Sequence, residues 1–183
     1  MKNPFFVSAA VPLLLVLFCG AAPARADLLG TTATVNYDYP TVGTVLYPGG
    51  TQVIVPGGTT FPVAGGDDPV VVTGSNMLIT FTYGWEFANE PKTFDGFVLS
   101  DPGAGITGVS LAGTNIAGFT SSDITFDAND VYVNFMPYST FSTLPAGAEV
   151  SVDIATTPEP ASWMLLGTGM MAGAFFYRRR LFA

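Results

Sequence analysis

The chain has 183 residues, of which 14 are Asp or Glu and six are Lys or Arg, and its formal net charge is −8. It contains no histidine, which removes the commonest general base and the commonest zinc ligand, and its one cysteine, Cys19, excludes a disulfide within the chain. Thirteen acidic residues and a single base, Lys92, lie between positions 27 and 157. This formal charge of −12 argues against nucleic-acid binding, because phosphate contacts require Lys and Arg.

The first 26 residues have the three parts of a secretory signal peptide. Lys2 precedes an apolar stretch at residues 5–18, and Ala24 and Ala26 form the small-x-small pattern that signal peptidase accepts. The pattern predicts a signal helix, export by the Sec-type machinery and cleavage after Ala26. The alternatives are an uncleaved membrane anchor, for which the apolar stretch is short, and lipidation at Cys19, which follows an unfavourably bulky phenylalanine.

Residues 27–155 are expected to form one acidic, all-β domain. Short runs rich in Val, Thr, Ile, Phe and Tyr alternate with turn signals, and no stretch keeps helical periodicity over three turns. Many short strands with tight turns favour an antiparallel β-sandwich or jelly roll. In chain order, the predicted strands are 32–39, 44–47, 52–55, 60–63, 70–73, 77–83, 93–99, 108–111, 124–126, 131–135 and 148–155.

The sequence Pro-Gly-Gly-Thr occurs twice in this domain, at residues 48–51 and 56–59. A glycine after a proline supplies the positive φ that a type II turn requires. Both copies are therefore expected to form hairpin corners.

Asp127, Asn129 and Asp130 occupy the turn of the clearest predicted hairpin, residues 124–135, and Asp123 lies one strand away. Asp and Asn favour turns because their side chains hydrogen-bond to the following backbone. Their oxygen atoms also suit calcium, which takes six to eight oxygen ligands. Both interpretations stay open, although the chain lacks the later bidentate glutamate of a complete calcium loop.

The sequence assigns no catalytic residue. Glu86 and Glu90 lie beside Trp85, but they fall in one expected loop, whereas the two acids of a glycosidase flank the sugar bond from separate elements. Aromatic residues that a β-sandwich exposes could stack on sugar rings, and the alternative is core or cross-strand packing. The candidates are Tyr37, Tyr39, Tyr47, Tyr83, Trp85, Tyr132 and Tyr138.

Residues 156–183 differ in composition from the acidic domain. Pro158-Glu159-Pro160 precedes an apolar stretch at residues 161–177, which is at the short end for a transmembrane helix. Arg178-Arg179-Arg180 follows directly, and arginines beside a membrane span favour the cytoplasmic side. Because Lys2 favours the same side at the other end, the acidic domain is expected outside the membrane.

These three features, in this order, resemble a PEP-CTERM sorting tail, and the resemblance covers residues 156–180. It implies recognition by exosortase, a membrane protease of Gram-negative bacteria that make exopolysaccharide and biofilm matrix. The implied course is transient anchoring in the inner membrane by the C-terminal helix, processing near the Pro-Glu-Pro motif, and release to or attachment at the cell surface or matrix.

Three segments of the acidic domain, residues 94–101, 106–109 and 124–135, also resemble a β-rich domain that recurs in PEP-CTERM proteins without an assigned catalytic activity. The expected function is that of a non-enzymatic surface or extracellular-matrix protein, associated with biofilm or exopolysaccharide. The alternative is a carbohydrate- or calcium-binding β-sandwich module of the same matrix. The expected partners are the Sec-type machinery, signal peptidase, exosortase and exopolysaccharide.

Overall fold

A computed structural model describes residues 27–86, 92–136 and 143–157, together with Gly167, Gly169 and Met170. Residues from Asp27 to Thr157 form a compact unit. In the described part of this unit, the regular structure consists of strands and two short 3-10 helices, so the predicted all-β class is confirmed. The strands are β1 Thr32–Asp38, β2 Val45–Val53, β3 Thr59–Val63, β4 Asp68–Val72, β5 Asn76–Phe81, β6 Trp85–Glu86, β7 Gly96–Ser100, β8 Ile106–Thr114, β9 Ile124–Phe126, β10 Asp130–Asn134, β11 Thr143–Leu144 and β12 Ala148–Thr156. The 3-10 helices are η2 Ala64–Gly66 and η3 Ser121–Asp123.

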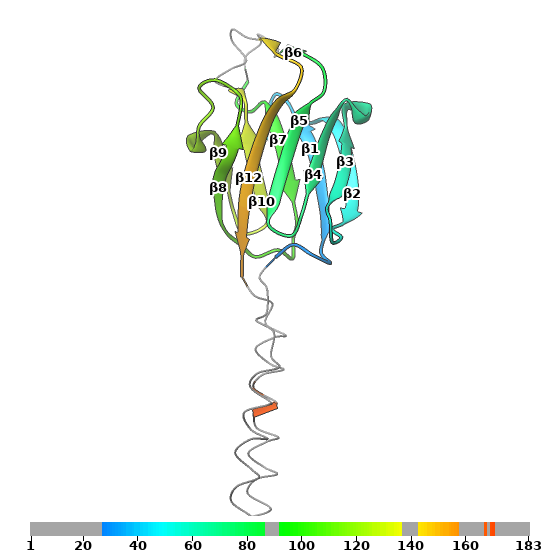
Figure 1. Cartoon of the computed structure of the whole chain (residues 1–183), viewed down its shortest axis with the longest axis vertical. Coiled ribbons are helices and arrows are strands. Elements are labelled where there is room, and N and C mark those ends of the chain that lie inside the picture. The colour runs from blue at the N-terminus through cyan, green and yellow to red at the C-terminus, as the bar shows by residue number, and fades with distance from the viewer. Residues whose placement is uncertain (1–26, 87–91, 137–142, 158–166, 168, 171–183) are drawn as a thin grey trace, which may run out of the picture. The chain divides into compact units, whose positions relative to one another are not determined.

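Two five-stranded antiparallel sheets face each other (Figure 1). The β1 sheet has the order β2-β1-β7-β10-β9, and the β12 sheet has the order β3-β4-β5-β12-β8. The chain passes between the sheets at both edges, from β2 to β3 and from β8 to β9. Two short strands, β6 and β11, pair separately. The arrangement confirms the predicted β-sandwich.

Buried and exposed residues alternate along the strands, and the buried side chains fill the space between the two sheets. Every second residue of β5 and β12 is buried, as the pleat of a strand with one solvent-facing side requires. Several aromatic side chains of the core pack edge to face against one another. Burial of each large apolar side chain contributes about 1.5–3 kcal/mol to folding. The aromatic residues that are at most 1% exposed are Tyr37, Phe61, Phe81, Phe97 and Phe135.

The predicted corner at residues 48–51 is wrong, because β2 runs straight through it and joins two predicted strands into one. The pairing with β1 slips between Val35 and Asn36, which leaves Gly49 as the extra residue of a β-bulge. A Cβ atom on Gly49 would lie 2.7 Å from both the carbonyl oxygen of Val35 and a methyl group of Val63. Glycine is therefore needed here for close packing across the sandwich, and no turn forms.

The second copy of the motif, residues 56–59, forms the predicted turn. The N–H of Gly58 donates to the carbonyl oxygen of Val55 at 3.0 Å, and Gly57 has a φ of 92°. This is the positive φ that a type II turn requires after proline. The turn connects β2 to β3, which lie in different sheets, so it is a corner between the sheets and does not close a hairpin.

The domain begins and ends at the same end of the sandwich. The N–H of Leu28 donates to Gly74 O at 2.6 Å, and the N–H of Ile154 donates to Ser75 O at 2.8 Å. Neighbouring residues of one turn therefore hold both the first residues of the domain and its last strand. We call this the proximal end, and the opposite end, which holds the β1–β2 loop and the start of β7, the distal end.

Candidate functional site

The residues assigned to sorting lie mainly outside the described ranges. These are Ala24 and Ala26, Pro158-Glu159-Pro160, and Arg178-Arg179-Arg180. Of the predicted transmembrane helix, the described residues are Gly167, Gly169 and Met170, which have helical backbone. Within the described parts of the chain, no helix has the length and apolar character needed to span a membrane.

The described part of the domain ends directly before the Pro-Glu-Pro segment of the tail, without a linker. Thr156 is the last residue of β12, and the next residue, Thr157, donates its N–H to Gly105 O at 2.9 Å. The Pro-Glu-Pro motif therefore begins directly after a residue that is hydrogen-bonded into the domain.

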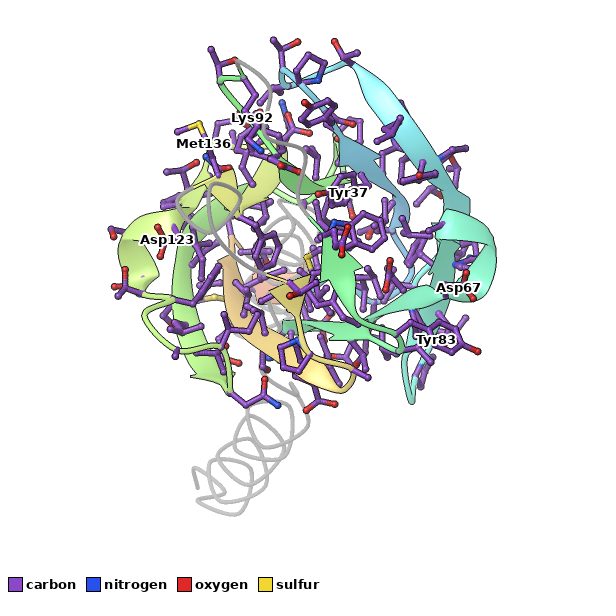
Figure 2. The ribbon with its side chains drawn as sticks, turned by 90° about the horizontal axis from the view of Figure 1, so that it is seen from above. Tyr37, Asp67, Tyr83, Lys92, Asp123 and Met136 are labelled. Carbon is purple, nitrogen blue, oxygen red and sulfur yellow. The ribbon has the colours of Figure 1, made fainter. Side chains whose placement is uncertain are left out.

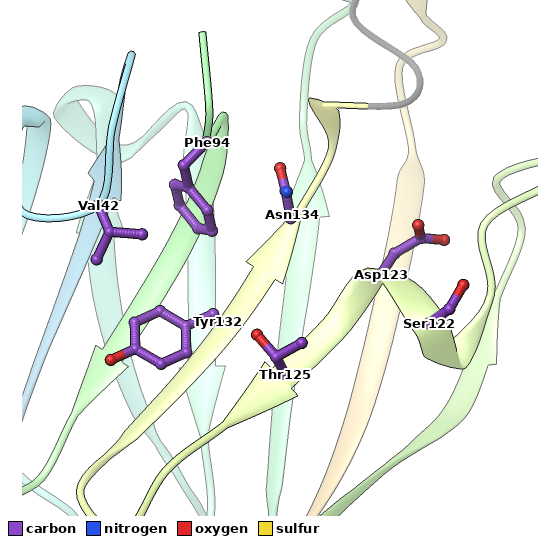
Figure 3. Close-up of a pocket in the computed structure, with 7 residues that line it drawn as sticks. All are labelled: Val42, Phe94, Ser122, Asp123, Thr125, Tyr132 and Asn134. Carbon is purple, nitrogen blue, oxygen red and sulfur yellow. The ribbon is translucent and has the colours of Figure 1, made fainter.

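An open pocket with a volume of about 480 Å³ lies on the outer face of the β1 sheet, at the distal end (Figure 3). Ligand pockets commonly measure about 300–1,000 Å³, so its size is suitable for a small ligand. The lining residues are Val42, Phe94, Ser122, Asp123, Thr125, Tyr132 and Asn134.

The alternation of β10 places two of the residues that line this pocket. Val131 and Val133 are fully buried between the sheets, so Tyr132 and Asn134 project from the opposite face. Thr125 of β9 is the cross-strand partner of Tyr132. The predicted β9–β10 hairpin is thus confirmed, and its solvent-facing residues form the centre of the pocket.

Aromatic and aliphatic groups form one wall. The rings of Phe94 and Tyr132 meet edge to face, with centroids 6.4 Å apart and an interplanar angle of 84°. Val42 lies in the β1–β2 loop and is 52% exposed. The Tyr132 hydroxyl donates to Asp127 Oδ2 at 3.0 Å, and partial burial together with this bond raises the pKa of Tyr132. The phenol therefore stays neutral, and its ring orientation is fixed from the turn.

Polar groups form the other wall. Asn134 Oδ1 accepts the backbone N–H of Asp95 at 3.3 Å and that of Met136 at 2.9 Å. These bonds orient the side-chain amide and leave its NH₂ group as a donor. Asp123 closes the turn of η3, where its Oδ2 accepts the backbone N–H of Thr120 at 2.8 Å. The pocket therefore combines an amide donor, a threonine hydroxyl and a carboxylate with an apolar wall.

The calcium candidates Asp127, Asn129 and Asp130 form the turn between β9 and β10. Asp127 Oδ1 accepts the N–H groups of Asn129 and Asp130 at 2.8 and 2.9 Å, and its Oδ2 accepts the Tyr132 hydroxyl. These bonds lower the pKa of the Asp127 carboxyl, with the Asn129 N–H as the largest cause. Among the described residues, no group of three or more acidic, His or Cys side chains is arranged to hold a metal ion.

The single base of the domain is bound internally at the distal end. Lys92 Nζ lies 2.8 Å from Asp95 Oδ2, and the two side chains are 5% and 2% exposed. The Tyr37 hydroxyl donates to the other oxygen of Asp95. Tyr37 itself lies in the interior of the sandwich (Figure 2), where burial and then the Asp95 charge raise its pKa. Asp95 thus lies in the loop before β7, and the strand predicted from residue 93 begins at Gly96.

A second aspartate of the segment 94–101 also has a structural position. Asp101 is 1% exposed, and its carboxylate accepts the Thr31 hydroxyl and the N–H of Gly103. These bonds tie the end of β7 to the residue before β1. The acidic residues that carry the resemblance in this segment therefore hold the β1 sheet together.

The predicted aromatic candidates divide between the core and the surface. Tyr37 and Trp85 pack against each other, with ring centroids 5.2 Å apart, and Tyr39 packs against the core. Tyr47 and Tyr83 are exposed, and Tyr138 lies outside the described residues. Of the described candidates, Tyr132 alone lines the pocket.

Sequence reasoning missed most of the pocket. Val42, Phe94, Ser122 and Thr125 come from three segments that carry no local binding motif. The polar positions of β10 were the available signal, because a tyrosine and an asparagine alternate with buried valines there.

Comparison with known proteins identifies the tail. The model of the PEP-CTERM protein-sorting motif matches residues 156–180. This confirms the resemblance and its span. The chain matches none of the curated proteins and none of the solved structures significantly.

Proposed function

We propose, from the premise that a PEP-CTERM sorting motif makes this chain an exported exosortase substrate, that its acidic β-sandwich is a non-enzymatic component of the cell surface or the extracellular matrix. The observation that carries the proposal is the position of the motif. It begins at Thr156, within the last strand of a compact domain. The folded domain is thus the cargo that sorting delivers.

The proposed route uses both ends of the chain. Residues 1–26 direct Sec-type export in a Gram-negative cell, and signal peptidase cuts after Ala26. The apolar segment 161–177 then holds the protein in the inner membrane, with Arg178-Arg179-Arg180 on the cytoplasmic side. Exosortase processes the chain near Pro158-Glu159-Pro160, after which the domain is released or attached among exopolysaccharide and biofilm matrix.

The distribution of acids in the domain supports a non-enzymatic function. Asp95, Asp101 and Asp127 accept hydrogen bonds that hold loops and turns. Among the described residues that line the pocket, Asp123 is the single carboxylate. Glycoside hydrolysis generally needs a pair of carboxyl groups on the two sides of the scissile bond. The remaining acids keep the domain strongly anionic, which favours solubility outside the cell.

The experiment that tests the route is the intact mass of the protein from isogenic cells with and without a working exosortase. Processing predicts a species that begins at Asp27 and ends near Pro158 in the competent cells alone. A species that keeps Arg178-Arg179-Arg180 in both strains would refute exosortase processing. A species that keeps residues 1–26 would refute the signal peptide.

A further inference from the structure

We propose that the pocket on the outer face of the β1 sheet binds one sugar ring of a neutral glycan. The proposal rests on the proposed extracellular function for its setting, because export would bring the pocket into contact with glycans. The choice of ligand rests on three properties of the pocket and the domain. These are an apolar wall, a set of polar groups from Thr125 and Asn134, and the absence of an accessible basic side chain between positions 27 and 157.

The apolar wall suits the carbon–hydrogen face of a sugar. The accessible part of this wall comes from the ring of Tyr132 and from Val42 (Figure 3). Phe94 is 5% exposed and supports the Tyr132 ring by edge-to-face packing. The Tyr132 hydroxyl bonds to Asp127, so the ring is held from its far end. An aromatic side chain that is fixed before the ligand arrives loses little conformational entropy on binding.

The polar wall suits hydroxyl groups, each of which both donates and accepts. Asn134 offers its NH₂ group as a donor, because its oxygen already accepts two backbone N–H groups. The exposed Thr125 hydroxyl can donate or accept, and the Asp123 carboxylate accepts. An arrangement of a few oriented polar groups beside an apolar wall is typical of small-ligand sites.

The charge of the domain selects a neutral glycan over an anionic one. The pocket includes Asp123 and no basic residue, and the single base between positions 27 and 157, Lys92, is buried against Asp95. Uronates, sulfated sugars, phosphates and nucleotides would meet a repulsive field without a compensating cation.

The pocket lies at the end of the domain opposite to its first and last residues. Both ends of the domain lie at the proximal end, beside Gly74 and Ser75, whereas the pocket lies at the distal end.

The test is calorimetric titration of the purified exported protein with four neutral oligosaccharide series: cello-, malto-, manno- and galacto-oligosaccharides. Oligouronates serve as the anionic comparison. Thr125→Val removes the hydroxyl at nearly constant shape, and Asn134→Asp keeps the oxygen that orients the loop while removing the NH₂ donor. Thr60→Val is the matched control, because Thr60 is exposed on the opposite sheet.

We expect binding of at least one neutral series, weaker or no binding of oligouronates, and a loss of affinity of about fivefold or more for each pocket variant, as the loss of one hydrogen bond predicts. Thr60→Val should bind like the wild type, and all variants should keep the wild-type melting temperature to within a few degrees. The proposal is overturned by an absence of binding to all four series at millimolar concentration. It is also overturned by tighter binding of oligouronates, or by affinities that Thr125→Val and Asn134→Asp leave unchanged. Each of these failures leaves the mass test of exosortase processing unaffected.

Discussion

Asp95 holds Lys92 and is in turn held by Tyr37, a residue 58 positions earlier in the chain. The pair is buried beside the aromatic core, where each charge helps to compensate the other for the loss of water. This pair links the loop before β7 to β1 across the distal end of the domain.

Removal of one partner of the pair should therefore destabilise the domain strongly. Lys92→Met keeps the aliphatic length but leaves the Asp95 carboxylate buried and uncompensated, at an expected cost of about 3–5 kcal/mol. Urea unfolding followed by tryptophan fluorescence measures this change. Tyr83→Phe is the control, because Tyr83 is 63% exposed and its hydroxyl should contribute almost nothing. A Lys92→Met protein as stable as the wild type would show that the pair does not hold the domain.

Tyr37→Phe tests the other bond of the same carboxylate. The ring keeps its contacts with Phe97 and Trp85, and the change removes the hydroxyl alone. Because Asp95 then loses a buried donor, we expect a loss of about 1–3 kcal/mol in the free energy of unfolding. Equal stability of the two proteins in urea would contradict the assigned bond.

Gly49→Ala should disturb the close approach of the two sheets. Its added methyl group would lie 2.7 Å from backbone and side-chain atoms, too close for either to accommodate without a shift. Overpacking of this kind costs about 1–3 kcal/mol. Gly113→Ala in β8 is the matched control, since no atom lies within 4 Å of the position of its Cβ. Thermal unfolding should separate the two variants clearly, and equal losses would show that Gly49 is not needed for packing.

Asp68 should make the stability of the domain depend on pH. Its side chain is 1% exposed with no hydrogen bond to Oδ2, and burial, followed by the neighbouring Asp67 charge, raises its pKa from 3.8 to about 6. The Asp68 carboxyl therefore binds a proton more tightly in the folded state than in the unfolded state. The contribution of protonated Asp68 to the free energy of unfolding is fully present below about pH 4. It is lost as the pH rises to about 6, where the buried carboxyl ionises.

Asp68→Asn isolates this effect. Free energies of unfolding should be measured from pH 3 to pH 8. Between about pH 4 and 6 the wild type should lose stability while the variant does not, and above that range the difference between them should stay constant. Asp67→Asn should keep the pH dependence but move it to lower pH, because the variant removes the second cause of the raised pKa. Parallel profiles for Asp68→Asn and the wild type would disprove the assignment.

Calcium should leave the melting temperature unchanged. Three hydrogen bonds occupy the oxygens of Asp127, which is the central residue of the calcium candidate. A site with a Kd near 1 mM would stabilise the protein by about 1.4 kcal/mol at 10 mM calcium, an effect that calorimetry resolves easily. A calcium-dependent increase that Asp127→Ala abolishes would restore the metal interpretation.

The sequence predicted correctly those elements that are determined by neighbouring residues in the chain. The hairpin from residue 124 to 135 combines an Asp-Asn turn with alternating valines, and both of its strands lie where that pattern puts them. Gly49 was misread because proline followed by glycine indicates a turn, whereas its function depends on Val63 in the opposite sheet. The two-residue strands β6 and β11 are too short to have any periodicity.

The dependence on distant residues also explains why the sequence did not predict the pocket. Tyr132 could be named from its strand, but Val42 and Phe94 reach the pocket from loops that only the finished sheet brings together. No spacing along the chain encodes such an assembly. The sorting tail is the opposite case, because its three parts are contiguous and the comparison confirms them over residues 156–180.

The burial of Lys92 has a chemical consequence for the delivered domain. Between positions 27 and 157 there is no other lysine and no arginine, and the side chain of Lys92 is 5% exposed. The folded domain therefore offers amine-directed reagents no accessible side-chain target, and trypsin would find a single, shielded cleavage point. In a matrix, such a surface would resist aldehyde cross-linking and tryptic digestion for as long as it stays folded. Loss of the fold would expose the one lysine at which both can begin.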